Sequence, residues 1–303
     1  MSNAPRTWTI GELLTWTTDF FVRKGIDEPR LSAELLLSHA LACTRMALYT
    51  QYERVPAESQ LTAFRENVKK RAEHVPVAYL IGAASFFSLD LLVNRHVLIP
   101  RPDTETLVEQ IVQRIRQTPG WETPALLDVG TGSGCIALAL ARNLSTAQVV
   151  ASDLSPEALA VARQNAEKLG LAQRVTFLEG DLFDALAQTS PVPPRRFHAI
   201  VSNPPYIPTG QIAGLQPEVR DHEPRQALDG GPDGLTVIRR LVSEATAYLL
   251  PGGLLGLEVA FDQGPTVAKL LEQSGYLTGV RIARDAAGHQ RCVIANKVSD
   301  GQS

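Results

Sequence analysis

The sequence has few of the features that mark secreted, membrane-spanning or disulfide-stapled proteins. Its 303 residues include only three cysteines, Cys43, Cys135 and Cys292, which lie far apart and form no CxxC pair. No apolar run approaches the roughly 18 residues that a membrane span requires, and no basic segment followed by an apolar stretch opens the chain. These absences exclude a disulfide framework, and we expect a reduced, cytoplasmic protein with no membrane partner.

The sequence also lacks an excess of charge of either sign. Lys and Arg number 29 against 32 Asp and Glu, a formal net charge of -3. A near-neutral, slightly acidic chain has no general attraction for a polyanion. The run Lys69-Lys70-Arg71 is typical of a solvated helix face, and the six histidines show no metal-ligand spacing. We therefore expect neither a metal nor direct binding to nucleic acid.

The length and the helical periodicity of the first part predict a small N-terminal domain. Apolar residues recur at helical spacing from Ile10 to Phe21, again from Glu28 to Leu41, and again from Glu58 to Glu73, with Gly25 and Pro76 as stop signals. Residues 1–75 are therefore predicted to form a small helical bundle. From Ala83 to Leu98 the pattern becomes aromatic and β-branched, which predicts a hairpin with Ser88 and Asp90 as turn residues in a linker over 76–102.

The remainder, 103–303, alternates short apolar strands with helices. The alternation starts at Ala125–Val129, and the pattern of parallel strands joined by helices predicts a doubly wound α/β domain. The elements expected after this first strand are helices over 136–142, 157–169, 235–249 and 265–273, strands over 148–152, 175–178, 199–202 and 253–259, and two closing strands near Val280 and Val293. Residues 207–233 show no clear period, and a loop of that length next to a motif favours a functional lid.

A glycine-rich turn follows the first of these strands. Gly130-Thr131-Gly132-Ser133-Gly134 leads directly into a helix, so a ligand can lie against the backbone at the carboxyl end of the strand. A dinucleotide fingerprint requires GxGxxG, whereas the spacing here is GxGxG. The spacing favours a cofactor without a pyrophosphate, such as S-adenosylmethionine.

Two acidic residues stand at the ends of the next two strands. Asp153 is predicted to accept hydrogen bonds from both ribose hydroxyls of the cofactor. Asp181 is predicted to bind the adenine amino group, with Leu182 and Phe183 against the ring. Alone, a glycine turn can be only a tight bend and a strand-end Asp only a helix cap. Three such features at three consecutive strand ends predict a nucleoside cofactor site.

The fourth strand ends in Asn203-Pro204-Pro205-Tyr206, which we interpret as the catalytic and substrate-binding motif. The prolines stiffen the segment and direct the Pro204 carbonyl. That carbonyl and the Asn203 side-chain oxygen can together accept both hydrogens of a planar NH2 group, against which Tyr206 can stack. The arrangement presents the nitrogen lone pair to a methyl donor. No general base is needed, because the alkylated nitrogen is acidic. The alternative is a rigid turn that merely ends a strand.

Together these motifs resemble the HemK-type protein glutamine N5-methyltransferases, most closely the branch that modifies peptide chain release factors. Beyond the two motifs above, the resemblance includes Ile99-Pro100-Arg101-Pro102-Asp103-Thr104-Glu105, Glu223-Pro224, Ala227-Leu228 and Asp233-Gly234-Leu235. It implies a seven-stranded Rossmann-like class I methyltransferase domain and a target glutamine in a Gly-Gly-Gln motif. It also implies cofactor contacts at Gly130 to Gly134, Asp153, Leu182 and Asn203, although the family often has an aromatic where this chain has Leu182.

Alternatives remain at this level. The sister branch, which modifies a ribosomal protein, typically has Ser in place of Pro102. Asn-Pro-Pro-Tyr also occurs in DNA adenine N6-methyltransferases, which must extrude a base and contact phosphates; the acidic first helices do not favour that substrate. A cofactor-sensing module without turnover is a third possibility. Arg101 and Glu105 are interpreted either as functional residues or as a surface ion pair.

Overall fold

The computed structural model describes residues 7–187 and 196–299, which fall into two compact units. The first unit contains the described residues up to Ala83 together with Gln216–His222, and the second contains the other described residues. Within the described ranges, no helix is both long enough and apolar enough to cross a membrane.

The first unit is a helical bundle. Its helices are α1 (Ile10–Arg23), α2 (Pro29–Leu41), α3 (Arg45–Thr50), α4 (Glu58–Ala72), α5 (Val77–Ile81) and α10 (Pro217–His222). A capping box begins α1, in which Thr9 Oγ1 accepts from the Glu12 N–H and the Glu12 carboxylate accepts from the Thr9 N–H. Leu14, Phe21 and Leu36 are among the fully buried side chains of the bundle core. The three predicted helices are confirmed, and α3 and α5 are additional.

Arg71 corrects one prediction within this unit. It lies in the basic run expected on a solvated face, but its side chain is buried, whereas Lys69 and Lys70 are exposed. The guanidinium donates to Ser32 Oγ and to the Asp27 and Val75 carbonyls and forms a 2.6 Å ion pair with Glu218 on α10. A buried arginine requires such partners, because an unpaired buried charge is strongly destabilising. The apolar periodicity of α4 indicates which face of the helix is buried. It does not explain why a charged residue is buried on that face, because the explanation lies in the partners of Arg71.

A two-stranded hairpin, β1 (Ala83–Phe86) and β2 (Leu89–Leu92), occupies the predicted linker. Phe87 and Ser88 both have positive φ. This is the backbone conformation of the tight hairpin turn whose twist matches that of the flanking strands. Ser88 is therefore a turn residue as predicted, whereas Asp90 lies within β2. The Phe87 N–H donates to the Glu105 carboxylate at 2.8 Å, so Glu105 holds the hairpin turn.

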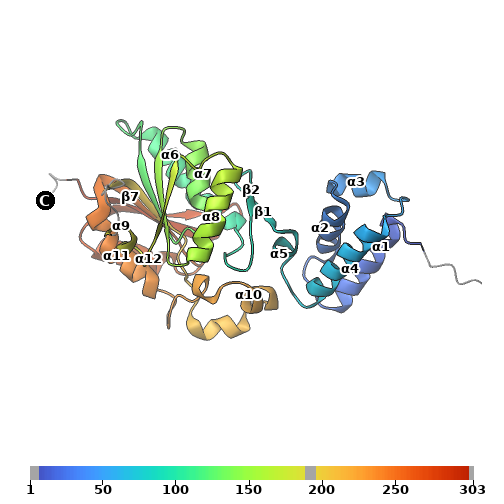
Figure 1. Ribbon diagram of the computed structural model, residues 1–303. Coiled ribbons are helices and arrows are strands. Elements are labelled where there is room, and N and C mark those ends of the chain that lie inside the picture. The colour runs from blue at the N-terminus through green and yellow to red at the C-terminus, as the bar shows by residue number, and fades with distance from the viewer. Residues whose placement is uncertain (1–6, 188–195, 300–303) are drawn as a thin grey trace, which may run out of the picture. The chain divides into compact units, whose positions relative to one another are not determined.

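The second unit contains a seven-stranded sheet, shown edge-on in Figure 1. Its strands are β3 (Ala125–Val129), β4 (Gln148–Asp153), β5 (Val175–Glu179), β6 (Phe197–Ser202), β7 (Leu249–Glu258), β8 (Leu277–Arg284) and β9 (Gln290–Lys297). Their order is β5-β4-β3-β6-β7-β9-β8, and β9 runs opposite to the direction of the other six strands. The predicted doubly wound α/β fold is confirmed.

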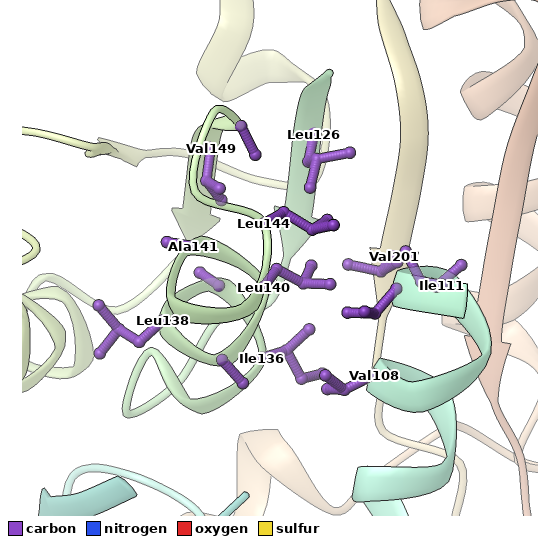
Figure 2. Packing of buried hydrophobic residues seen from close by; sticks show 14 of the residues in the cluster. Val108, Ile111, Leu126, Ile136, Leu138, Leu140, Ala141, Leu144, Val149 and Val201 are labelled. Atoms are coloured by element: carbon purple, nitrogen blue, oxygen red, sulfur yellow. The ribbon is translucent and has the colours of Figure 1, made fainter. Parts of the chain in front are cut away.

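Helices cover both faces of this sheet. They are α6 (Pro102–Gln117), α7 (Cys135–Asn143), α8 (Pro156–Lys168), α9 (Asp184–Ala187), α11 (Thr236–Tyr248) and α12 (Gly264–Gln273). Buried side chains of α6 and α7 pack on one face, and those of α11 and α12 pack on the other. Figure 2 shows the first of these layers, in which Leu140 of α7 and Leu144, the residue that follows this helix, lie among Leu126, Val201 and Ile111. Each such side chain contributes on the order of 2 kcal/mol through burial of apolar surface.

The strand order creates the crevice in which the predicted site lies. From β3 the chain proceeds outward to β4 and β5 and then returns to β6 on the other side of β3. The loop after β3 and the loop after β6 therefore lead to opposite faces of the sheet. They leave a crevice between them at the carboxyl ends of the strands, which is where open α/β sheets bind ligands.

Candidate active site

The sheet register brings four predicted segments to one edge. Val129 of β3 pairs with Ser152 of β4 and with Ser202 of β6, so the residues that follow these strands are spatial neighbours. In the same way, Asp153 pairs with Glu179 of β5, which precedes Gly180 and Asp181. The glycine loop, Asp153, Asp181 and the Asn-Pro-Pro-Tyr motif therefore converge by topology alone.

The glycine loop leaves open space beside its backbone. Gly130 and Gly132 have positive φ, and a Cβ built on either would meet no atom within 4 Å. Gly134 differs, because a Cβ there would lie 3.1 Å from Leu138 and 3.2 Å from Ala162. Gly134 thus allows α7 to pack against α8, while Gly130 and Gly132 leave a cradle that a ligand can occupy.

Asp128, directly before the loop, holds its shape from beneath. One carboxylate oxygen accepts from Thr131 Oγ1 at 2.6 Å and from the Ala137 N–H at 3.1 Å. Burial raises the pKa of this carboxyl to about 7, and the two donors act in the opposite direction. The side chain is fully buried and so supports the loop rather than contacting a ligand.

Asp153 is partly exposed and is preorganised by backbone donors. Its Oδ2 accepts from the Gly132 N–H at 2.8 Å and its Oδ1 from the Ser155 N–H at 2.9 Å. Burial nevertheless raises the pKa of the carboxyl, with these backbone bonds opposing the shift. Each oxygen keeps a further lone pair, so the carboxylate can accept two more hydrogen bonds from a vicinal diol.

Asp181 and Leu182 form another part of the pocket wall. The Asp181 carboxylate forms an ion pair with Arg240 of α11 at 2.9 Å, and both side chains are about 43–44% exposed. Leu182 has a positive φ of 47°, an unusual conformation for a branched side chain. Arg240 is a partner that the sequence analysis does not predict.

Asn203 is held from behind by a buried hydroxyl. Its Nδ2 donates to Thr104 Oγ1 at 3.2 Å, which leaves the Oδ1 atom available as an acceptor. Pro204 is buried and Pro205 lines the pocket. The Tyr206 hydroxyl donates to Glu258 at 3.3 Å, and its backbone carbonyl accepts from the Gln263 side chain.

The segment after Tyr206 folds back onto the motif. The Ile207 N–H donates to the Leu228 carbonyl, and the Gly230 N–H donates to the Ile207 carbonyl. A Cβ at Gly230 would lie 2.8 Å from the Pro205 carbonyl oxygen and from Tyr206 Cα, and one at Gly234 would lie 2.3 Å from the Tyr206 carbonyl oxygen. These two glycines therefore permit close packing against the motif, and short helices η1 (Thr209–Gly214) and η2 (Arg225–Ala227) replace the expected irregular loop.

A buried glutamate ties this segment to the strand-to-helix connection before α6. Glu223 forms an ion pair with Arg101, and its other oxygen accepts from the Ile99 N–H at 3.4 Å. Burial raises the pKa of Glu223, whereas Arg101 lowers it. Arg101 is therefore bound to Glu223 and not to Glu105, which corrects the ion pair considered from the sequence.

These residues surround a cavity of about 490 Å³, a size typical of small-molecule sites. Of the predicted site residues, it is lined by Gly130, Thr131, Gly132, Ser133, Asp153, Asp181, Leu182, Asn203 and Pro205. Gly134, Pro204 and Tyr206 are not among the lining residues. Pro224, Gln226 and Ala227 from the folded-back segment complete one wall. Among the described residues, no group of three or more His, Cys, Asp or Glu side chains is arranged to hold a metal ion.

Comparison with known protein families gives two matches. The model described as the PrmC N-terminal domain matches residues 12–82, and a model described as a methyltransferase domain matches residues 123–278. The latter covers more than half of the chain.

Curated relatives match nearly the whole length. The release factor glutamine methyltransferase of Rhodopirellula baltica is 45% identical over 294 residues, which is 96% of this chain and 97% of the relative. The protein of the same name from Geobacter sulfurreducens is 45% identical over 276 residues, 91% of this chain and 93% of the relative.

Among solved structures, the hMettl16 catalytic domain in complex with MAT2A 3'UTR hairpin 6 superposes with a TM-score of 0.53. It is 14% identical and covers 71% of this chain and 77% of that chain. At this identity the likeness concerns the fold alone.

Proposed function

The chain belongs to the family of release factor glutamine methyltransferases, and from this premise we propose that it transfers a methyl group from S-adenosylmethionine to a glutamine side-chain amide in the Gly-Gly-Gln motif of a peptide chain release factor. The observation that carries the proposal is the placement of Asn203, with a free side-chain oxygen, in the wall of a pocket that also contains the open glycine cradle and Asp153. The three free cysteines, Cys43, Cys135 and Cys292, agree with a cytosolic reaction.

The residues of the pocket fit S-adenosylmethionine. A side chain at Gly130 or Gly132 would occupy the cradle. Because both residues are glycines, the cradle stays open and suits the amino acid moiety of the cofactor, which can lie against the backbone. The Asp153 carboxylate suits ribose hydroxyls, and the Asp181 and Leu182 segment suits the adenine base. When bound there, S-adenosylmethionine supplies an electrophilic methyl group.

The chain's own contribution is to orient the acceptor amide. Asn203 Oδ1 and the Pro204 carbonyl accept the two amide hydrogens, and Tyr206, which Glu258 holds outside the cavity lining, restrains the motif. Acceptance of both hydrogens increases electron density on nitrogen and directs its lone pair away from the acceptors. Transfer would form an N–CH3 bond as the bond between the methyl group and the sulfonium sulfur breaks, which would leave a neutral thioether, and the displaced N–H proton would pass to water. The helical unit over 1–75 is proposed to bind the release factor at a distance from the glutamine.

A transfer assay with labelled S-adenosylmethionine tests the function. The substrates are an intact release factor, its variant with Ala in place of the Gly-Gly-Gln glutamine, the ribosomal protein modified by the sister branch, and duplex DNA. We expect label on the intact release factor alone. Preferential labelling of the ribosomal protein or of DNA would overturn the proposal, and label on the Ala variant would show that another residue is the acceptor.

Asp153→Ala tests the cofactor site. The variant loses a carboxylate that accepts hydrogen bonds from hydroxyls, so S-adenosylmethionine should bind about 1–3 kcal/mol more weakly. Calorimetric titration gives the affinity, and circular dichroism checks the fold. Asp233→Ala is a matched control, because this exposed aspartate pairs with Arg239 and does not line the cavity. Equal affinity of a folded Asp153→Ala protein and the wild type would remove Asp153 from the site.

A further inference from the structure

Two buried side chains lie behind Asn203: Thr104, from the segment Ile99 to Glu105 that the family resemblance includes, and Glu258, which belongs to none of the motifs described above. Thr104 is in the first turn of α6 and Glu258 is the last residue of β7; each side chain is only 2% exposed. Asn203 Nδ2 donates to Thr104 Oγ1, and the Thr104 side chain lies beside the Glu258 carboxylate and lowers its pKa. The Oε2 atom of this carboxylate is buried and has no hydrogen-bond partner of its own. Tyr206 reaches the same carboxylate through its hydroxyl. Two paths therefore lead from the Asn-Pro-Pro-Tyr motif to Glu258, one through Thr104 and one through the Tyr206 hydroxyl.

The chemistry of the three groups favours one direction for the first path. An ionised carboxylate only accepts hydrogen bonds and Glu258 Oε2 has no other donor, so the single hydrogen of the Thr104 hydroxyl is best directed toward Glu258. The hydroxyl oxygen can then only accept from Asn203. An amide presents its NH2 group to such an acceptor, which leaves its carbonyl oxygen as the free atom. A flipped Asn203 would place its oxygen against an oxygen that has no hydrogen to offer.

We propose that Thr104 and Glu258 are positioning residues that hold the Asn203 side-chain amide with Oδ1 as the acceptor for the substrate NH2 group. This inference rests on the proposed function for the identity of the substrate, but the orientation of Asn203 is a property of the protein alone. A flipped amide would present a donor to a group that is itself a donor, so the site would repel the substrate hydrogens it must accept.

The network also carries a pH dependence. Burial raises the pKa of Glu258 to about 7; Asp103 raises it further, whereas Thr104, Tyr206 and Arg291 lower it. Above this pH the ionised carboxylate enforces the direction of the path. Below it the protonated carboxyl can itself donate, and the orientation of Asn203 is no longer forced. Activity that depends on this orientation should therefore rise as the pH increases through about 7.

The pH dependence due to Glu258 must be distinguished from that of other titratable groups near it. Burial raises the thiol pKa of Cys135 and of Cys292 to about 12, so both stay neutral near pH 7. Burial also raises the pKa of Tyr206. Asp128 has a pKa of about 7 and titrates in the same range. Glu258→Gln keeps Asp128, so any pH dependence left in that variant is not due to Glu258.

The kinetic test compares Thr104→Val, Thr104→Ser and Glu258→Gln with the wild type on intact release factor. Thr104→Val keeps the shape but removes the hydroxyl, and we expect kcat to fall by about 10- to 100-fold, as for other groups that orient a site residue. S-adenosylmethionine affinity by calorimetry should stay within about threefold, because neither residue lines the cavity. Thr104→Ser should recover most of the lost rate. Glu258→Gln should lower kcat and flatten the rise through pH 7.

A second measurement needs no substrate and therefore separates this inference from the proposed function. In protein labelled with ¹⁵N asparagine, the Asn203 side-chain amide should exchange slowly and its shift should titrate with a midpoint near pH 7. Thr104→Val should abolish the slow exchange, and Glu258→Gln should abolish the titration. Fast exchange in the wild type, or a Thr104→Val protein with wild-type exchange and kcat, would overturn the proposal. Loss of rate in Thr104→Ser equal to that in Thr104→Val would assign Thr104 a packing role instead.

Discussion

Asn203→Ala should lower kcat on an intact release factor by about 100- to 1000-fold, the usual cost of removing one preorganised polar contact at a reacting group. The substitution removes the oxygen that accepts an amide hydrogen and also removes the NH2 group that donates to Thr104 Oγ1. Cofactor affinity should fall far less, because the glycine cradle, Asp153 and the Asp181 segment remain.

Single-turnover rates with saturating cofactor give the chemical step directly, and calorimetry gives cofactor affinity. Asn143→Ala is a matched control, because Asn143 ends α7, its side-chain amide donates to the Ala139 carbonyl, and it does not line the cavity. It should retain wild-type turnover. Near-normal turnover of Asn203→Ala, or a loss of cofactor binding as large as the loss of rate, would contradict the assigned role.

The architecture of the second unit follows closely from sequence periodicity. The strand over Ala125–Val129 is predicted with its observed bounds, because a short, mainly apolar run lies between a proline and the glycine turn, and all five residues are buried in the structure. The predicted elements do not include α6, although Leu107, Ile111 and Ile115 recur at helical spacing after Pro102. The helical pattern is present in this stretch. The stretch also contains part of a family motif, however, and it is interpreted for function and not for secondary structure.

The parts of the candidate site that lie on loops after strands are also predictable, because parallel strands end at a common edge. The supporting partners are not. Thr104 is 99 residues from Asn203, and Glu258 ends a strand that is otherwise apolar. Nothing in the spacing of these residues indicates that they meet. The pairing between Arg101 and Glu223 cannot be predicted for the same reason, since 122 residues separate them and only the fold brings them together.

Shortening the substrate should reduce kcat/KM by a larger factor than any single substitution in the pocket. Asn203 is half-buried and offers one side-chain oxygen to the substrate. A glutamine amide can make few other contacts. Free glutamine must therefore lose all of its rotational freedom for little binding energy. In an intact release factor, contacts remote from the glutamine can hold the amide in line for transfer, and such contacts raise the rate and not only the affinity.

We expect kcat/KM to decrease from intact release factor to a short Gly-Gly-Gln peptide to free glutamine, by on the order of 1000-fold or more in total. The glycines next to the glutamine should also matter, because only residues without Cβ allow a backbone to approach a narrow site closely. Replacing the glycine before the glutamine by Ala in the intact release factor should therefore cost rate while leaving the remote contacts in place. The measurement is the initial rate of label transfer at equal enzyme concentration across the series. Comparable kcat/KM for free glutamine and intact release factor would mean that the pocket alone determines specificity, and the helical unit would then have no role in recognition.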